Sequence, residues 1–255
     1  MASNLNVSEI EPGAILKSTP QFLYDISAIN EYKVHDRMLI AVDCIIFGFD
    51  NEDLKVLLIK RGFEPGLGKW SLMGGFVKAT ESADEGANRI LDLLTGLTKI
   101  YMEQLYSFTG VGRDPVDRVV SIAYFALIKI DNYSPELLTE HHASWVSIKK
   151  IPSMIFDHKE MIELAKERLR QKVAAYPIGF ELLPEKFTLA QLQNLYEAIY
   201  ESKFDKRNFL RKILLIGVLK KLDEKEKQGS KRGSFYYKFD NKKYQKLKQQ
   251  GIKFI

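Results

Sequence analysis

The chain has 255 residues, of which 45% are hydrophobic and 28% are charged, and this composition is typical of a folded globular protein rather than a disordered one. Its apolar runs are too short to cross a bilayer, and its first residues lack the basic stretch and apolar core of a secretory signal. These features argue against a membrane or secreted protein, and we expect a cytoplasmic one. The single cysteine, Cys44, cannot form an internal disulfide, and its apolar neighbours predict a place in the core.

Positive charge is concentrated at the C-terminal end. Residues 185–255 hold 18 Lys and Arg against 8 Asp and Glu, a net charge of +10, whereas residues 1–184 hold 20 against 25, a net charge of −5. An acidic body with a basic C-terminal segment indicates a polyanion as the partner of that segment. A solvated, lysine-rich surface is the alternative, and the charge alone does not decide between them.

The first predicted elements form a β-hairpin. Residues 1–36 are polar without a clear period, and they could form either a flexible arm or a packed extension. Two apolar, β-branched runs follow at 38–49 and 54–59, and the polar residues 50–52 between them predict a turn.

A glycine loop and a helix come next. Residues 70–73 lead into Gly74 and Gly75, and Gly96 is placed to end the following helix. The apolar residues at helical spacing between them are Ala83, Ala87, Ile90, Leu91 and Leu94. A long strand at 118–130, a short strand at 145–148 and a helix at 157–170 complete a mixed α/β pattern.

The pattern changes after residues 176–184, which contain two prolines and a glycine and predict a linker. Two amphipathic helices follow at 188–200 and 205–216, each beginning at a residue of the N-cap type, and two strands at 217–222 and 234–239 flank a charged turn. We therefore expect an N-terminal extension at 1–36, a mixed α/β domain at 37–175, a linker at 176–184, and a helix–helix–hairpin domain at 185–255.

The glycine loop and its helix carry a motif of known spacing. Gly75, Glu81, Arg89, Gly96 and Leu97 lie at the intervals of the Nudix box, G-x5-E-x7-R-E-U-x-E-E-x-G-U, in which U is aliphatic. The preceding string KWSLMGGFV also resembles the strand that enters this loop in Nudix proteins. The resemblance covers residues 38–170 and implies the α/β Nudix fold, a mixed sheet between helices.

The box departs from the family pattern where its glutamates belong. This chain has Ile90, Leu93 and Leu94 at those positions. In Nudix hydrolases the glutamates hold Mg²⁺ or Mn²⁺, which neutralises a diphosphate and activates a water. Aliphatic side chains offer no oxygen ligand, so the resemblance implies a domain without hydrolase activity, and we expect no metal and no cofactor.

Other acids lie close to the box. They are Glu81, Asp84, Glu85 and Asp92. A rebuilt metal site from these carboxylates is an alternative, but a metal site needs a fixed number and geometry of ligands. Glu85 lies four residues before Arg89, a spacing that allows a contact on the helix surface. Glu81 and Arg89 could also serve only to stabilise the loop.

The C-terminal pattern of two helices and a hairpin predicts a winged helix-turn-helix. Its second helix would place Phe209, Ile213 and Ile216 toward the core. Lysine and arginine neutralise phosphates or pair with guanine, and asparagine pairs with adenine. The residues predicted to contact DNA from this helix and from the wing tip are Lys206, Arg207, Asn208, Arg211, Lys212, Lys231 and Arg232.

A Nudix-like domain followed by a winged helix resembles the Nudix-related transcriptional regulators. The strings VDCIIFGF, FTLAQLQNLYEAIY, DKRNF and GSKRG are most similar to the arabinose-responsive branch of that family. This resemblance implies a homodimeric repressor that binds a double-stranded DNA operator and is released by L-arabinose or a related sugar. A branch that senses ADP-ribose is the alternative.

The effector is expected between the sheet and the box loop. A carboxylate with a cationic or amide donor suits sugar hydroxyls, and an aromatic face suits the C–H side of a sugar ring. The residues predicted to line this site are Asp43, Lys60, Arg61, Trp70, Ser71 and Glu81. Two other functions are alternatives to this one: a Nudix hydrolase with an appended basic domain, and a non-catalytic RNA-binding or scaffolding protein.

Overall fold

The structure is a computed structural model that describes residues 35–98, 100–130, 142–175, 180, 182–227 and 233–249. The chain divides into two compact units, Met1–Arg37 and Met38–Ile255, and all elements given below belong to the second unit. The predicted N-terminal extension lies almost wholly outside the described residues. Among the described helices, none combines the length and apolar character needed to cross a membrane.

A mixed sheet, seven-stranded over the described residues, is built around strand β1 (Leu39–Phe49). β1 pairs in parallel with β6 (Val119–Lys129) along its whole length. It pairs antiparallel with β2 (Leu54–Lys60) near its end and with β4 (Met73–Phe76) near its start. The remaining strands are β3 (Trp70–Ser71), β5 (Glu103–Phe108) and β7 (Ala143–Ser147).

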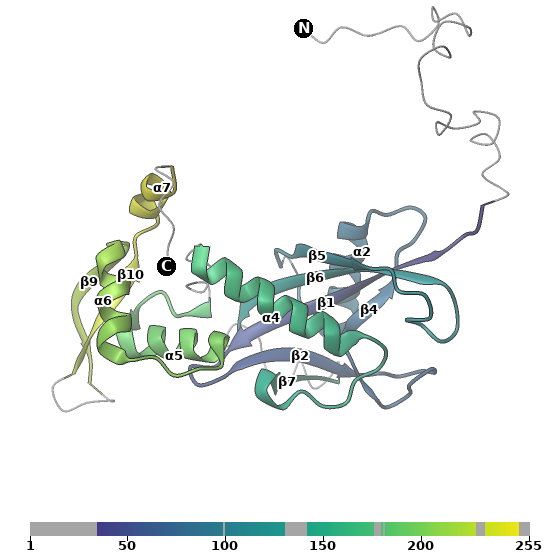
Figure 1. Cartoon of the computed structure of the whole chain (residues 1–255), viewed down its shortest axis with the longest axis horizontal. Coiled ribbons are helices and arrows are strands. Elements are labelled where there is room, and N and C mark those ends of the chain that lie inside the picture. The colour runs from purple at the N-terminus through teal and green to yellow at the C-terminus, as the bar shows by residue number, and fades with distance from the viewer. Residues whose placement is uncertain are drawn as a thin grey trace, which may run out of the picture. The chain divides into compact units, whose positions relative to one another are not determined.

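Helices cover both faces of this sheet, as Figure 1 shows. α4 (His158–Ala175) packs on the face that carries Ile45 and Phe47, and α2 (Ala83–Thr95) packs on the face that carries Cys44 and Ile46. Successive residues of a strand point to opposite faces, so a strand covered on both sides is apolar at nearly every position. The predicted core place of Cys44 is confirmed, since its side chain is fully buried.

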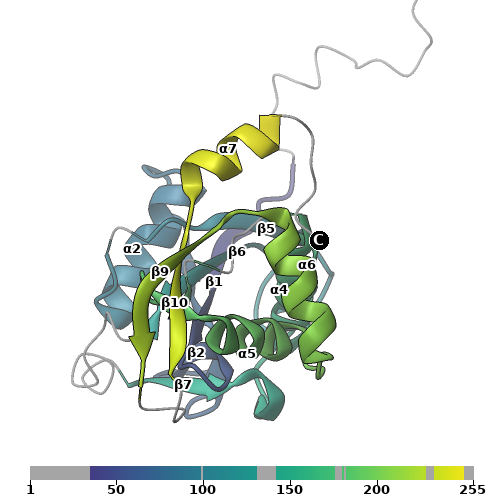
Figure 2. The same ribbon diagram turned by 90° about the vertical axis from the view of Figure 1, so that its left-hand side faces the viewer.

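The C-terminal part consists of helices packed on a three-stranded sheet in the order β8-β10-β9 (Figure 2). Thr188 and Asp205 cap the two predicted helices, and Phe209 and Ile213 are buried as expected. The elements are β8 (Phe187–Thr188), α5 (Leu189–Tyr200), α6 (Lys206–Ile216), β9 (Leu219–Glu226), β10 (Ser234–Phe239) and α7 (Asn241–Gln249).

Several element bounds differ from those predicted. Strand β9 begins two residues late because Gly217 adopts φ of 73° as the left-handed C-cap of α6. α4 continues five residues beyond the predicted end, Arg170, to Ala175. Strands β5 and β8 and helix α7 are not among the predicted elements, because β5 has a single buried residue, Leu105, β8 has only two residues, and α7 is mostly polar.

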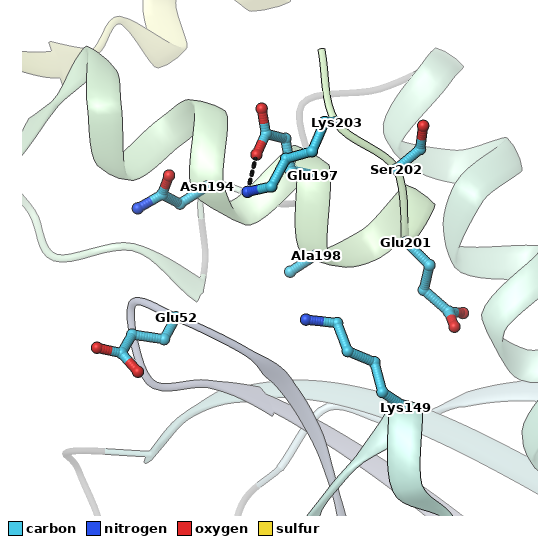
Figure 3. A pocket seen from close by; sticks show the side chains of 8 residues that line it. All are labelled: Glu52, Lys149, Asn194, Glu197, Ala198, Glu201, Ser202 and Lys203. Atoms are coloured by element: carbon cyan, nitrogen blue, oxygen red, sulfur yellow. Dashed lines mark hydrogen bonds and ion pairs between the residues drawn. The ribbon is translucent and has the colours of Figure 1, made fainter.

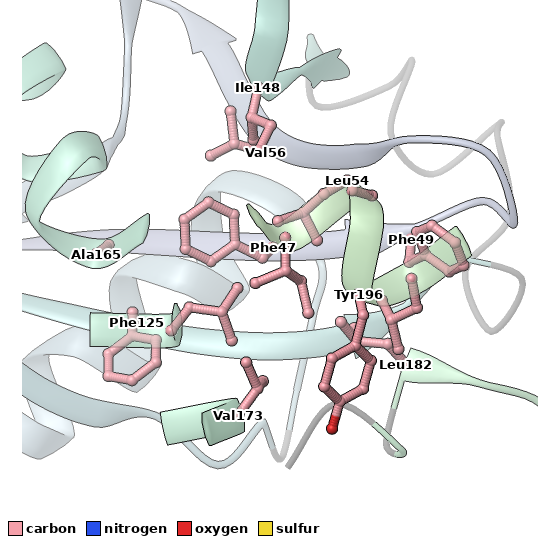
Figure 4. Close-up of a cluster of buried hydrophobic side chains, with 14 of the residues drawn as sticks. Phe47, Phe49, Leu54, Val56, Phe125, Ile148, Ala165, Val173, Leu182 and Tyr196 are labelled. Carbon is pink, nitrogen blue, oxygen red and sulfur yellow. The ribbon is translucent and has the colours of Figure 1, made fainter. Parts of the chain in front are cut away.

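One apolar cluster joins the two folded parts. It contains β1 and α4 residues together with α5 and α6 residues, among them Phe47, Ala165, Tyr196 and Phe209. Figure 4 shows Phe47 and Phe125 of the sheet in the same cluster as Tyr196 and Leu182. The mixed sheet and the C-terminal helices therefore share one continuous core.

Substitution of Phe47 by alanine tests this core. Phe47 is fully buried, so Phe47→Ala removes its burial and leaves a cavity, and we expect a loss of about 3–5 kcal/mol of unfolding free energy in urea denaturation. Tyr101→Ala, at an exposed position, is the matched control and should change stability by less than about 0.5 kcal/mol. Similar midpoints for the two variants would contradict this placement of the core.

Candidate functional site

Gly74 and Gly75, which were expected in a loop, lie within strand β4, and the segment that follows them, residues 77–82 (the glycine loop), is held by one ion pair. Arg89 donates from Nε to Glu81 Oε2 at 2.8 Å and from Nη2 to Glu81 Oε1 at 2.5 Å, and it also donates to the Phe76 carbonyl at 3.0 Å. The Lys78 backbone N–H donates to Glu81 as well. The hydrogen bonds from Arg89 and from the Lys78 backbone lower the pKa of Glu81 to about 2. Glu81 therefore stabilises the loop, the alternative role expected for it.

Glu85 does not pair with Arg89. It closes a capping box with Ser82, because the Glu85 carboxylate accepts from the Ser82 backbone N–H at 2.7 Å and the Ser82 hydroxyl accepts from the Glu85 N–H at 3.2 Å. The predicted surface contact between Glu85 and Arg89 is thus wrong. The cap competes successfully because it satisfies the first free N–H groups of α2.

The box positions that carry glutamates in Nudix hydrolases are apolar in this structure too. Ile90 is buried, and its Cδ1 lies so close to Gly75 that a Cβ there would meet it at 2.8 Å. Leu93 is 66% exposed on the helix surface. Asp84 accepts a hydrogen bond from the Tyr124 hydroxyl at 2.5 Å. Within the described residues no group of three acidic, histidine or cysteine side chains is arranged to hold a metal ion, so the residues present do not fit the Nudix metal.

A buried polar cluster, formed by Asp43, Arg113, Ser121, Asp157 and His158, lies on the α4 side of β1. Asp43 is 5% exposed, and Ser121 Oγ donates to its Oδ2 at 2.5 Å. Arg113 Nη2 lies 3.7 Å from Asp43 Oδ2, and His158 Nε2 lies 3.5 Å from Asp43 Oδ1. A carboxylate buried in a strand needs such partners, because an unpaired buried charge is strongly destabilising.

Two residues of this cluster, Asp157 and His158, lie at the start of α4 and fix its position. The Leu72 backbone N–H donates to His158 Nδ1 at 3.1 Å, which places the imidazole proton on Nε2, facing Asp43. Burial lowers the pKa of His158, which favours the neutral form of the ring. Asp157 accepts two hydrogen bonds from Arg113 at 2.8 and 2.7 Å. The first residues of α4 are therefore fixed to the strands around the glycine loop.

The structure brings only part of the predicted effector site together. Asp43 and Ser71 both contact His158, Ser71 through its hydroxyl at 3.4 Å from Nδ1. Lys60 lies beside Trp70, with its Nζ 3.9 Å from the ring centroid. Glu81 belongs to the loop ion pair instead of this group.

Arg61 packs between two aromatic rings. Its guanidinium carbon lies 3.9 Å from the Phe63 ring centroid and 5.6 Å from that of Phe156, and its buried Nε has no hydrogen-bond partner. The sequence did not single out Arg113, Asp157 or His158. Asp157 and His158 lie in a string that resembles Nudix proteins, but nothing local shows that they approach Asp43.

The second candidate site is the exposed face of α6. Phe209 and Ile213 anchor the helix in the core, so the polar residues between them face outward. Arg211 donates to Asn208 at 3.3 Å, and no predicted cation of this helix forms an ion pair with a described residue. The exposed polar residues of α6 are Lys206, Arg207, Asn208, Arg211 and Lys212. The predicted wing-tip residues Lys231 and Arg232 lie outside the described residues.

Two family models match the chain. The NUDIX domain matches residues 38–165, and the NrtR DNA-binding winged helix domain matches residues 179–239. The chain is also 33% identical over 202 residues to the ADPR responsive transcriptional repressor NtrR of Acinetobacter baylyi, an alignment that covers 78% of this chain and 81% of that relative. The chain belongs to the NrtR family of Nudix-related regulators.

Two further relatives match the chain over different lengths. The structure of Shewanella oneidensis NrtR complexed with a 27mer DNA is 28% identical, with a TM-score of 0.69, and the match covers 81% of this chain and 95% of that one. An ADP-ribose pyrophosphatase of Methanocaldococcus jannaschii is 30% identical over 138 residues, which is 53% of this chain and 77% of that enzyme. NrtR family membership confirms the predicted fold class, a Nudix domain with a winged helix.

The loop ion pair makes a prediction about acid stability. Because the pKa of Glu81 is lowered, its contribution to stability is complete above about pH 4.5 and is lost as the pH falls toward 2. Glu81→Gln should therefore lower the thermal midpoint at pH 7, and its midpoint should fall less steeply than that of the unmodified protein between pH 4.5 and 2.

Thermal scans across this pH range measure the effect. Glu160→Gln, at an exposed position of α4, is the control and should follow the unmodified protein. Parallel curves for Glu81→Gln and the unmodified protein would show that the ion pair does not stabilise the loop.

Proposed function

We propose that this NrtR family member is a DNA-binding transcriptional repressor whose Nudix domain binds ADP-ribose as its effector. The observation that carries the proposal is the outward face of α6, where five polar residues stand on a helix held by Phe209 and Ile213. A helix of this kind can enter the major groove while its cations contact phosphates. The Acinetobacter relative is a repressor by name, and the Shewanella relative was solved with DNA.

The expectation of L-arabinose finds no support among these relatives. The Acinetobacter repressor is named for its response to ADP-ribose, and the Methanocaldococcus relative is named for acting on it. The alternative branch weighed from the sequence is therefore the better proposal. L-arabinose is retained only as a comparison ligand in the test below.

Cations and aromatic rings near β2 suit ADP-ribose. Lys60 lies against Trp70, and Arg61 lies between Phe63 and Phe156. Cationic groups can bind a diphosphate directly, and flat rings can stack on adenine. Binding of this kind needs no divalent metal, in agreement with the apolar box positions. These contacts are part of the proposal, as is the predicted homodimer, in which two winged helices would read a palindromic operator.

DNA binding by α6 predicts the effect of Arg207→Ala. Loss of this exposed cation should weaken operator binding by about tenfold and reduce the slope of log affinity against log salt by about one, if Arg207 contacts a phosphate. Fluorescence anisotropy at several salt concentrations measures both quantities. Lys78→Ala, an exposed lysine in the Nudix part, is the control and should leave the affinity unchanged. Salt-insensitive or absent DNA binding by the unmodified protein would refute the proposed function.

The effector assignment predicts a selective response. ADP-ribose should lower operator affinity by about five- to 150-fold, the usual size of an allosteric coupling, whereas L-arabinose should have no effect. A response to L-arabinose without a response to ADP-ribose would contradict the proposal and support the arabinose-responsive branch.

The substituted box predicts no hydrolysis. With Mg²⁺ or Mn²⁺ present, ADP-ribose should remain intact, because Ile90, Leu93 and Leu94 supply no oxygen ligand. Release of AMP and ribose 5-phosphate, followed by chromatography, is the measurement. Turnover that disappears in Glu85→Gln would instead support the hydrolase alternative, which the Methanocaldococcus relative keeps open.

A further inference from the structure

The contact between α4 and α5 centres on one carboxylate. Glu201 Oε1 lies 2.7 Å from Lys166 Nζ and 2.8 Å from Arg170 Nη2. Arg170 Nε also donates to the Ile199 carbonyl at 3.1 Å, and the Tyr200 hydroxyl donates to the Arg170 carbonyl at 3.2 Å. We call these five residues the Glu201 clasp. Lys166 is almost fully buried, and it pairs with Glu201 across this contact and with Glu163 of its own helix at 3.0 Å.

Backbone geometry does not explain a glutamate at this position. Glu201 is the C-cap of α5 and has φ of 52°, in the left-handed region where glycine is the usual residue. A non-glycine residue is strained in this region. The feature that only this side chain provides is its pair of contacts to α4.

The end of α5 also contacts the start of α6. Glu197, one turn before Glu201, accepts from the Phe204 N–H at 3.1 Å and pairs with Lys203 at 2.6 Å. The Phe204 ring stacks on Phe209 of α6, with centroids 5.7 Å apart. These contacts connect the end of α5 to the helix that carries the predicted DNA-binding face.

The opposite end of α4 belongs to the buried polar cluster of the Nudix domain. Asp157 and His158 are bonded there to Arg113 and the Leu72 backbone. At 1.5 Å per residue, the helix spans about 18 Å between His158 and Arg170. Charged groups thus fix a single helix both to the strands around the glycine loop and to the DNA-binding part.

Space beside α5 would allow such a movement. A pocket of about 330 Å³ lies between α5 and the residues Glu52 and Lys149 of the Nudix domain. Figure 3 shows Glu197, Glu201 and Lys203 on one side of this pocket and Lys149 reaching toward it from the other. The side of α5 that faces Glu52 and Lys149 is therefore separated from the Nudix domain by a pocket, whereas the clasp contacts α4 through close ion pairs.

We infer that α4 couples the effector domain to the DNA-binding helix, with the Glu201 clasp as the point of transmission. The inference rests on the proposed function for its biological meaning. It assigns Glu201, Lys166 and Arg170 as positioning residues, which act through the ion pairs between α4 and the end of α5.

A double-mutant cycle across α4 tests the inference without any ligand. Asp157→Asn loosens the Nudix end, and Glu201→Gly removes the clasp carboxylate while favouring the left-handed C-cap. Hydrogen exchange of the amides of residues 206–216 is measured in the full chain. Asp157→Asn alone should accelerate the exchange of these amides about threefold or more. In the Glu201→Gly background it should have no further effect. Residues this far apart act additively unless they are coupled, so this difference would show coupling through α4.

Ile90→Ala is the control for general destabilisation, because Ile90 packs on the other face of the sheet. Ile90→Ala should change the amide exchange rates of α6 by the same factor in the unmodified protein and in Glu201→Gly. Absence of an Asp157→Asn effect on α6, or an equal effect in both backgrounds, would overturn the inference.

Operator binding supplies the second measurement. ADP-ribose should bind Glu201→Gly within about twofold of its affinity for the unmodified protein by calorimetry, but should change operator affinity less than about threefold. An undiminished response in this variant would also overturn the inference. If the unmodified protein does not bind DNA or does not respond to ADP-ribose, the proposed function is wrong. The hydrogen-exchange cycle would still decide whether a change at the Nudix end of α4 alters the stability of α6.

Discussion

Burial of β1 on both faces is the constraint on which the rest of the structure depends. Its parallel register with β6 extends over the full strand, and helices cover it from both sides. From Ala41 to its end the strand has no solvated position for a charge, yet this stretch contains Asp43. The partners of that carboxylate, Ser121, Arg113 and His158, follow from the need to compensate it, and they fix the start of α4 as a consequence.

The glycine loop shows how a structural motif persists where the hydrolase ligands are absent. Glu81 and Arg89 hold the loop, and the capping box of Ser82 and Glu85 begins the helix. Neither requires the acids that bind metal in the hydrolases. The loop and the start of α2 are thus held in place without a carboxylate at positions 90, 93 and 94.

Within the described part of the chain, the winged helix does not form a separate hydrophobic core from the Nudix domain. Tyr196 and Phe209 belong to the same apolar cluster as Phe47 and α4, and the Glu201 clasp adds ion pairs to this contact. A shared core restricts relative movement to shifts that keep its side chains packed. Such a connection suits a sensor that must change the position of a DNA-binding helix.

The sequence by itself determined the features that depend on neighbouring residues. The β1–β2 hairpin, the helix caps at Thr188 and Asp205, the outward face of α6 and the apolar box positions all follow from periodicity and short-range spacing. Only the tertiary structure placed Arg113, Asp157 and His158 around Asp43, and showed that Glu81 holds a loop. The reason is physical: the partners of a buried charge are chosen by how distant segments pack, and a local pattern carries no record of that.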